Sequence, residues 1–240
     1  MGAQWKHAGR IAGSQKRGAL IGKLVKEILV AAKVGDPNPD NNTRLRAAVE
    51  SARKQSVPRD TIERAIKKGS GQLDGAAAFE TITYEGFAPH NVPVIVECLT
   101  DNKNRTASDV RLLFRKGQLG AIGSITWMFD RLGVIEATHA DKSLDIEGSA
   151  IEAGAQNVEP LESTEVPEGH VGARFFCDTT DLDAVNKTLT AAGWLVTLSE
   201  MNFIAKNAAE LPEAQKKEVT DFLEAIDDND DVHRIYTAIK

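Results

Sequence analysis

The chain changes character at a glycine-rich stretch that runs from Gly69 to Gly75. Before this stretch, apolar residues recur at the spacing of amphipathic helices, and after it they form the short runs typical of strands. The balance of charge changes at the same place. Residues 1–75 carry 15 Lys and Arg against 7 Asp and Glu, whereas the rest of the chain carries 14 against 28. The sequence therefore predicts a basic helical module joined by a flexible linker to an acidic α/β region.

Three helices are expected in the basic module, because three segments each place their apolar residues on one face. Either Asn41 or Asn42 can cap the second helix. The third begins either with Pro58 in its first turn or with Asp60 and Glu63 at the spacing of a capping box. Short connections between short helices predict a small bundle. The side chains expected to face inward are Leu20, Ile21, Leu24, Val25, Ile28, Leu29, Leu45, Ala48, Val49, Ala52, Ile62, Ala65 and Ile66.

The acidic region is predicted to contain two similar α/β units, one inserted in the other. Residues 132–205 have the order of a ferredoxin-like β-α-β-β-α-β unit. Its expected elements lie at 133–138, 144–153, 158–161, 171–177, 181–192 and 194–198. Residues 79–131 and 206–240 are interpreted as a second β-α-β-β-α-β set, split by the insertion. Its expected strands lie at 79–84, 92–99, 124–129 and 232–237, and its expected helices at 105–116 and 214–226.

The predicted fold class is therefore α+β, with an N-terminal three-helix domain plus two ferredoxin-like β-α-β-β-α-β domains, one inserted in the other. The first domain comprises a basic N-terminal arm and the helices, residues 1–75. The split domain comprises residues 79–131 plus 206–240, and the inserted domain residues 132–205.

A polar loop, Asp101–Arg105, follows the apolar strand at 92–99 and opens the next helix. It carries two cations and two amides where a strand meets a helix start, which is a common place to bind anions. The alternative is a purely local role. Asn104 or Thr106 can cap the helix, and Arg105 can pair with Asp101 or Asp109. The sequence leaves both possibilities open.

No pattern typical of an enzyme or a metal site is found in the chain. Neither a Walker A motif nor a strand-linked G-x-G-x-x-G is present, and the five histidines lack metal-ligand spacing. The acidic run 227–231 lacks the ligand ladder of an EF-hand and is interpreted as a solvated turn. Cys98 and Cys177 lie in apolar runs and are expected to be buried thiols in a reducing compartment. We expect no catalytic residues, no metal and no cofactor.

Without an apolar run near the length of a membrane span or an apolar segment at the N-terminus, the expected location is the cytoplasm. The N-terminal arm is Gly-rich and basic, and its Trp5 lies among cations. One interpretation is an arm whose aromatic ring stacks on a base, and the other is a tail whose Trp packs against the helices.

Several segments resemble the YebC family of bacterial regulators, whose mitochondrial relatives are translational activators. The matching runs are PRDTIERAIKKG from Pro58, YEGF from Tyr84, VIVECLTDNKNRT from Val94, GSITWMF from Gly123, AGA from Ala153 and DDVHRIY from Asp230. The resemblance covers nearly the whole chain and implies a helical domain plus two ferredoxin-like domains, one inserted in the other. It also implies a cytoplasmic, non-enzymatic regulator. Family members are described either as DNA-binding transcriptional regulators or as ribosome-associated factors that help translation through proline-rich stretches.

The sequence departs from the family at two places. Its N-terminus reads Gln4-Trp5-Lys6-His7 where the family has a His-Ser-Lys-Trp run. Its turn Lys116-Gly117-Gln118-Leu119-Gly120 is shorter than the family's usual Gly-Gly-Asn-Leu-Gly form. If that turn touches RNA, the contact differs in this chain.

Together, charge and resemblance predict a monomeric nucleic-acid-binding regulator that acts on translation at the ribosome, with ribosomal or transfer RNA as its partner and no membrane. The alternative is a DNA-binding transcriptional regulator that uses the same surface. A simpler explanation of the charge is that positive helices dock on negative domains, and Lys67 and Lys68 also complement a helix dipole. The residues expected to contact nucleic acid are Trp5, Lys6, Arg10, Lys16, Arg17, Lys23, Lys26, Arg44, Arg46, Arg53, Arg64, Lys67, Lys68, Asn102, Lys103, Asn104 and Arg105.

Overall fold

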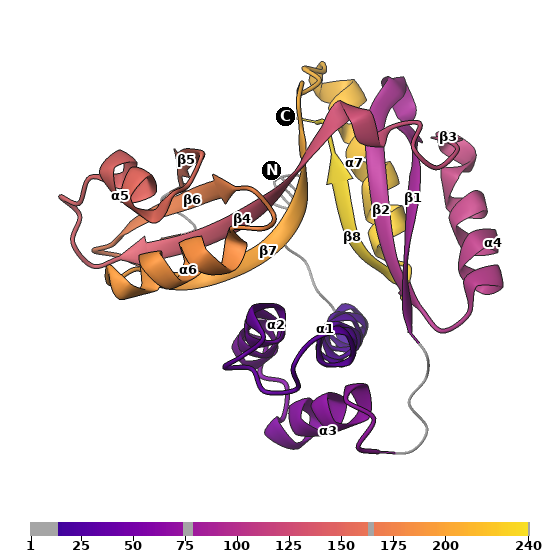
Figure 1. The fold of residues 1–240 in the computed structure, drawn as a ribbon. Coiled ribbons are helices and arrows are strands. Elements are labelled where there is room, and N and C mark those ends of the chain that lie inside the picture. Colours follow the sequence, from indigo (N-terminus) through magenta and orange to yellow (C-terminus); the bar gives the residue numbers. More distant parts are fainter. Residues whose placement is uncertain (1–13, 74–78, 163–165, 240) are drawn as a thin grey trace. The chain divides into compact units, whose positions relative to one another are not determined.

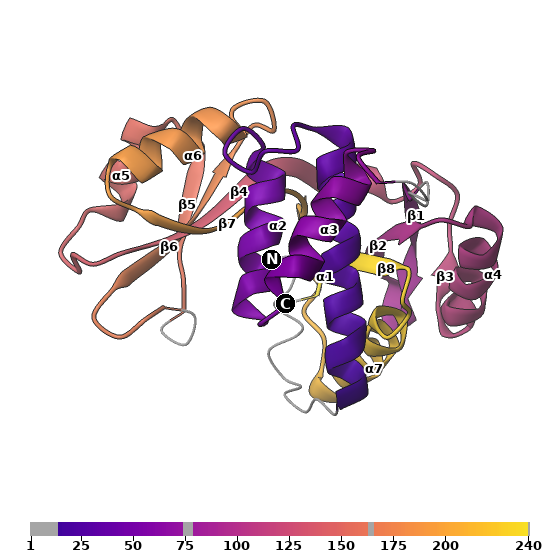
Figure 2. The same cartoon turned by 90° about the horizontal axis from the view of Figure 1, so that it is seen from below.

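The computed structural model describes residues 14–73, 79–162 and 166–239 (Figure 1). The basic module folds into α1 (Ser14–Val34), α2 (Thr43–Lys54) and α3 (Arg59–Gly69). These helices pack together around a core that includes Ile28, Leu45 and Ile62 (Figure 2). The predicted bundle is confirmed, although α1 begins earlier than its apolar stripe indicates.

The caps of α2 and α3 decide between the alternatives that the sequence left open. Asn42 caps α2, and its side chain accepts a hydrogen bond from the backbone N–H of Leu45 at 3.0 Å. Pro58 stands at the N-cap of α3, which has no side-chain cap. Glu63 instead accepts from Arg59 Nε at 2.7 Å, so the capping box does not form.

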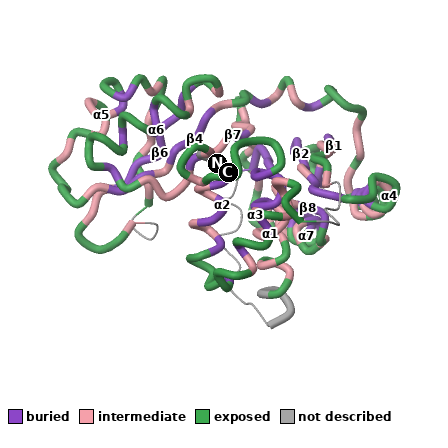
Figure 3. The backbone as a smooth tube through the Cα atoms, turned by 60° about the horizontal axis from the view of Figure 1, so that its bottom comes forward, coloured by how far each residue is buried: buried purple, intermediate pink, exposed green. Residues whose placement is uncertain are grey.

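The first sheet has the strand order β3-β1-β2-β8, and all three neighbouring pairs are antiparallel. Its strands are β1 (Glu80–Ala88), β2 (Val92–Thr100), β3 (Gln118–Leu119) and β8 (Val232–Thr237). Two helices, α4 (Lys103–Leu113) and α7 (Glu213–Asp227), pack on one face through Val110 and Phe222. On the other face, Ile95 and Tyr236 pack with residues from outside the sheet. Strand β2 is therefore buried along most of its length (Figure 3).

The elements of this split domain follow the chain order β-β-α-β-α-β, which is the order of the predicted segments but not the β-α-β-β-α-β order that was assigned to them. The predicted strand at 124–129 is wrong. Residues Thr126–Met128 form a short 3-10 turn, η4, and Phe129 begins the long strand β4 instead. The third strand of the sheet is β3, a two-residue strand that pairs with β1 at Gly86 and Phe87.

The inserted segment forms a second sheet with the order β5-β6-β4-β7. Its elements are β4 (Phe129–His139), α5 (Ile146–Ala153), β5 (Asn157–Pro160), β6 (Val171–Cys177), α6 (Leu182–Ala191) and β7 (Leu195–Ala205). This is the predicted β-α-β-β-α-β order. Trp194 packs edge-on against Phe175 at the centre of its core, with 5.1 Å between ring centroids.

The chain divides into two compact units, Arg131–Asn202 and a second unit of Met1–Asp130 with Phe203–Lys240. Strands β4 and β7 carry the chain from one unit into the other and back. In the part of the chain that the structure describes, no helix is long and apolar enough to cross a membrane.

Candidate nucleic-acid interface

The helical module presents a group of exposed cations on α2 and α3. Arg53, Arg64 and Lys67 are exposed, because the apolar positions of both helices turn inward to the bundle core. Among the described residues, no carboxylate lies within ion-pair distance of these three side chains, and Glu63 acts on Lys67 only from a longer distance. Arg46 is half-buried and donates to the carbonyls of Pro39 and Asp40, and Lys68 is half-buried at the end of α3. The α2–α3 cations are therefore available to an external anion.

The cations of α1 are held differently, since they face an acidic segment of the split domain. Lys23 Nζ lies 3.3 Å from Asp227 Oδ1 and also donates to the Asp227 carbonyl. Lys26 Nζ lies 3.1 Å from Asp231 Oδ1 and 2.8 Å from the carbonyl of Asp230. Any phosphate that approaches Lys23 or Lys26 must compete with these oxygens.

Glu27, on the same side of α1, is buried and surrounded by basic groups. Its carboxylate lies 2.7 Å from Arg44 Nε, 2.9 Å from His233 Nε2 and 3.8 Å from Arg234. Burial favours the neutral form of Glu27, but hydrogen bonds to His233 and Arg44 outweigh it and hold its pKa well below the usual value. The predicted nucleic-acid contact Arg44 is thus part of an internal ion-pair cluster.

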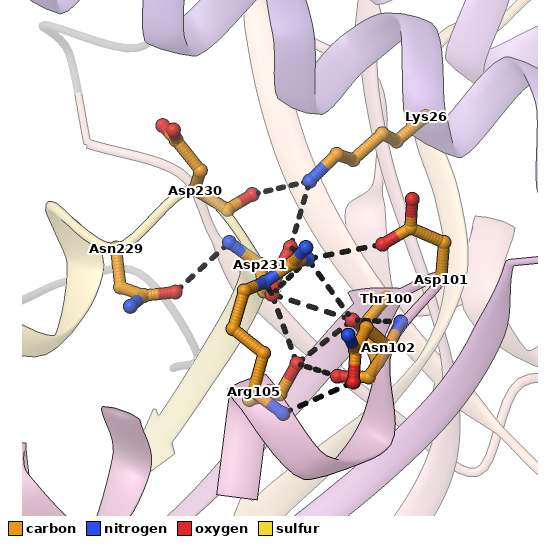
Figure 4. Close-up of polar contacts among 9 residues, drawn as sticks. Lys26, Thr100, Asp101, Asn102, Arg105, Asn229, Asp230 and Asp231 are labelled. Atoms are coloured by element: carbon orange, nitrogen blue, oxygen red, sulfur yellow. Dashed lines mark hydrogen bonds and ion pairs between the residues drawn. The ribbon is translucent and has the colours of Figure 1, made fainter. Parts of the chain in front are cut away.

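The polar loop at the start of α4 is built around Asp231 (Figure 4). Arg105 Nη2 lies 2.8 Å from Asp231 Oδ2 and 3.0 Å from Asp101 Oδ1. The hydroxyl of Thr106 donates to the same Asp231 oxygen at 2.9 Å, and Lys26 approaches the other. Burial would raise the pKa of Asp231, but the bonds from Arg105, Thr106 and Lys26 lower it below its ordinary value.

These contacts correct two expectations about the loop and the acidic run. The cap of α4 is Asn102, whose side chain accepts from the Arg105 N–H at 3.1 Å, and not Asn104 or Thr106. The acidic run 227–231 is not simply solvated, because Asp231 is buried and binds two cations. The sequence identified Asp101 as a partner of Arg105 but missed Asp231, which lies 126 residues along the chain.

The remaining predicted contacts are distributed as follows. Lys103 is exposed and lies 2.5 Å from Glu80, and Asn104 is exposed. Lys16 and Arg17 lie in α1, but their side chains are outside the description. Trp5, Lys6 and Arg10 lie outside the described residues.

A buried carboxylate that sequence analysis did not single out organises the turn before β4. Glu85, in β1, accepts hydrogen bonds from the N–H groups of Gly123, Ile125 and Thr126 at 2.6, 2.7 and 2.9 Å. Burial opposes ionisation of Glu85, but these backbone bonds outweigh it and lower its pKa. A charged residue at an inward position of a strand is the sequence signal that points to such a role.

The two cysteines have little capacity for nucleophilic chemistry. Burial raises the pKa of Cys98 to about 12 and that of Cys177 to about 11, so both thiols are protonated near neutral pH. Within the described ranges, no group of three or more His, Cys, Asp or Glu side chains is placed to hold a metal ion.

Comparison with known proteins gives matches along nearly the whole chain. A family model described as the TACO1/YebC protein N-terminal domain matches residues 3–72, and one described as the TACO1/YebC second and third domain matches residues 79–239. The probable transcriptional regulatory protein Bd1964 of Bdellovibrio bacteriovorus is 49% identical, with 100% of both chains covered. A probable transcriptional regulatory protein of Pseudomonas syringae pv. syringae is 51% identical over 100% of this chain and 99% of its own.

A solved structure has the same overall arrangement of elements. The crystal structure of the conserved hypothetical protein Aq1575 from Aquifex aeolicus superposes with a TM-score of 0.80 at 36% identity. The match covers 99% of this chain and 96% of the other. The predicted α+β class is therefore confirmed.

Proposed function

The chain belongs to the TACO1/YebC family, and from this we propose that it is a nucleic-acid-binding regulator of gene expression. Its relatives from Bdellovibrio and Pseudomonas are named probable transcriptional regulatory proteins, which supports a regulatory role. The observation that carries the nucleic-acid part is the exposed cation group on α2 and α3. Although the chain has a net charge of −6, no carboxylate among the described residues lies within ion-pair distance of Arg53, Arg64 or Lys67.

Phosphate contact explains such a group better than helix-dipole effects do. A dipole favours cations in the last turn of a helix, which accounts for Arg53 and Lys67 but not for Arg64 in the middle of α3. Lys and Arg that neutralise phosphates release bound counterions, and this release makes affinity fall with salt. Lys23, Lys26, Arg44 and Arg105 stay predicted contacts, each of which would exchange a carboxylate for a phosphate.

We propose further that the nucleic acid is RNA and that the protein acts on translation at the ribosome, by relieving stalling at proline-rich stretches. The resemblance to ribosome-associated members of the family supports this version. The second candidate, regulation of transcription through DNA, is favoured by the names of the relatives. The two differ in the partner found in cells: cross-linked ribosomal or transfer RNA supports the first, and promoter DNA the second.

The phosphate contact is tested with a triple variant, Arg53→Ala, Arg64→Ala and Lys67→Ala. We expect weaker binding to RNA and a slope of log affinity against log salt that is smaller by about two, at roughly 0.7 per contact for single strands. The matched control replaces three exposed lysines of the acidic region, Lys142, Lys187 and Lys217, and removes the same charge. Equal slopes for the triple variant and the unaltered protein would refute the assignment of this surface.

A further inference from the structure

The turn between β3 and β4 is held in one conformation by Glu85. The three backbone N–H groups bound by its carboxylate lie at Gly123, Ile125 and Thr126, and its own carbonyl accepts from Gly120 at 2.8 Å. Ile125 is fully buried beneath the turn. A buried, ionised carboxylate with three backbone donors is costly to remove, so this surface turn is rigid.

This rigid turn displays two large apolar side chains. Ile122 is 92% exposed and Trp127 is 67% exposed. The Trp127 Nε1–H donates to the carbonyl of Ser124 at 2.9 Å, which fixes the indole ring and satisfies its one polar atom. Folding gains little from either exposed side chain, whereas the neighbouring Ile125 and Phe129 supply the core contacts of this segment.

Two cations precede the turn in the chain. Arg115 and Lys116 are exposed in the short 3-10 turn that precedes β3. Strand β3 pairs with β1 at Gly86, next to Glu85. The negative charge of Glu85 is meanwhile taken up by backbone donors. The segment from η3 (Phe114–Lys116) to the turn therefore carries an oriented aromatic face and two exposed cations on the same β1-paired stretch of chain.

We propose that Trp127 stacks on an unpaired nucleobase of a single-stranded RNA, with Arg115 and Lys116 on the adjoining phosphates. This inference rests on the proposed function and adds a second contact to it. Aromatic platforms flanked by cations bind single strands with little sequence preference, because every base has a π-face. The satisfied indole N–H leaves the ring face as the binding element. A protein partner fits less well, since two exposed apolar side chains make a small patch beside the several hundred Å² usual for protein-binding patches.

The test compares Trp127→Ala and Trp127→Phe in the full chain, with Ile151→Ala as a control for loss of another exposed apolar side chain. The probes are a labelled mixed-sequence single-stranded RNA and the same strand in a blunt duplex, titrated at one fixed salt concentration. We expect Trp127→Ala to weaken single-strand binding about 5- to 100-fold and to leave duplex binding unchanged. Trp127→Phe should retain most of the affinity, and Ile151→Ala all of it.

A second readout reports the stack directly. RNA should quench a component of tryptophan emission in the unaltered protein that is absent from Trp127→Phe. The inference is overturned if Trp127→Ala binds single strands as the unaltered protein does, or weakens single-strand and duplex binding equally. It is also overturned if the variant keeps RNA affinity and loses a protein partner. If the unaltered protein binds neither RNA probe, the proposed function is wrong as well. If the α2–α3 triple variant binds RNA as the unaltered protein does while Trp127→Ala weakens single-strand binding, only the assignment of the basic α2–α3 surface is wrong.

Discussion

Replacing Asp231 with Asn tests whether this carboxylate joins the helical module to the split domain. Asp231 is buried immediately before β8, and its carboxylate contacts groups from α1, from α4 and from Thr100 at the end of β2. It lies 2.8 Å from Arg105 and accepts from Thr106 at 2.9 Å, both in α4, and 3.1 Å from Lys26 in α1. Asn has the same shape but no charge, and one of its two oxygens becomes an NH2 group that faces a cation.

The expected cost follows from how exposed each partner is. The Arg105 side chain is 48% exposed and that of Lys26 is 22% exposed, so solvent screens both ion pairs to about 0.2–1 kcal/mol each. The buried hydrogen bond from Thr106 to a charged acceptor contributes about 1.5 kcal/mol. Together these give about 2–3.5 kcal/mol, or a decrease of about 4–14 °C in Tm for a unit of this size.

Thermal unfolding followed by circular dichroism measures this loss, with Asp230→Asn as the matched control. Asp230 is exposed and binds Lys26 only through its backbone carbonyl, so this change should cost less than about 0.5 kcal/mol. Because the pKa of Asp231 is lowered in the folded state, its stabilisation is present above about pH 4. It is lost as the pH falls through the folded-state pKa. An Asp231→Asn variant as stable as Asp230→Asn at pH 7, or a gap that persists undiminished at pH 2, would contradict the argument.

Three further outcomes are expected. Glu85→Gln should lower the free energy of unfolding by about 1–3 kcal/mol and make the turn before β4 sensitive to proteolysis. Glu80→Gln, at an exposed position of the same strand, should leave the turn resistant. Limited proteolysis of the two variants measures the difference. Glu27→Gln should destabilise the protein by about 3 kcal/mol at neutral pH. This destabilisation should become smaller in acid, because the pKa of Glu27 is lowered on folding. Denaturant titrations at neutral and acidic pH measure both values. Cys98 and Cys177 should resist iodoacetamide in the native protein and react once it is unfolded, as mass spectrometry can count.

The periodicity of apolar residues predicted those helices and strands whose apolar pattern lies within their own segment. The helices α2 and α3 and all six elements of the inserted unit are present where they were predicted, but β4 begins four residues earlier and β7 ends seven residues later than expected. The failure at 124–129 has a physical reason. The run Ser124–Phe129 has the composition of a strand, but Glu85 takes up the N–H groups of Ile125 and Thr126, so these groups cannot join a sheet ladder. A contact between residues about forty apart is invisible to local pattern analysis.

The polar loop shows the same limit for a functional prediction. The sequence offered anion binding or local pairing, and the structure supplies a partner, Asp231, from a segment that follows the inserted unit. Local rules correctly placed an Asn at the cap of α2, and at α4 they selected Asn104 or Thr106 in place of Asn102. Which cations remain available to a ligand depends on tertiary pairing, so a count of Lys and Arg in the sequence overestimates the binding surface.

This pairing sets a bound on the salt dependence of binding. Of the predicted cations with described side chains, Lys23, Lys26, Arg44, Lys103 and Arg105 lie within ion-pair distance of carboxylates. If these pairs persist in the complex, the α2–α3 cations supply about three phosphate contacts, and the log–log salt slope they contribute is about −2 on single strands. The contributions of Arg115, Lys116 and the N-terminal arm can be removed by substitution and truncation. If the remaining slope is still steeper than about −2, phosphates displace the carboxylates from the five paired cations. In that case Asp231→Asn should raise the affinity, because the variant lacks the carboxylate that competes with phosphate for Lys26 and Arg105. The slope should not become steeper, because phosphates already contact both cations in the unaltered protein.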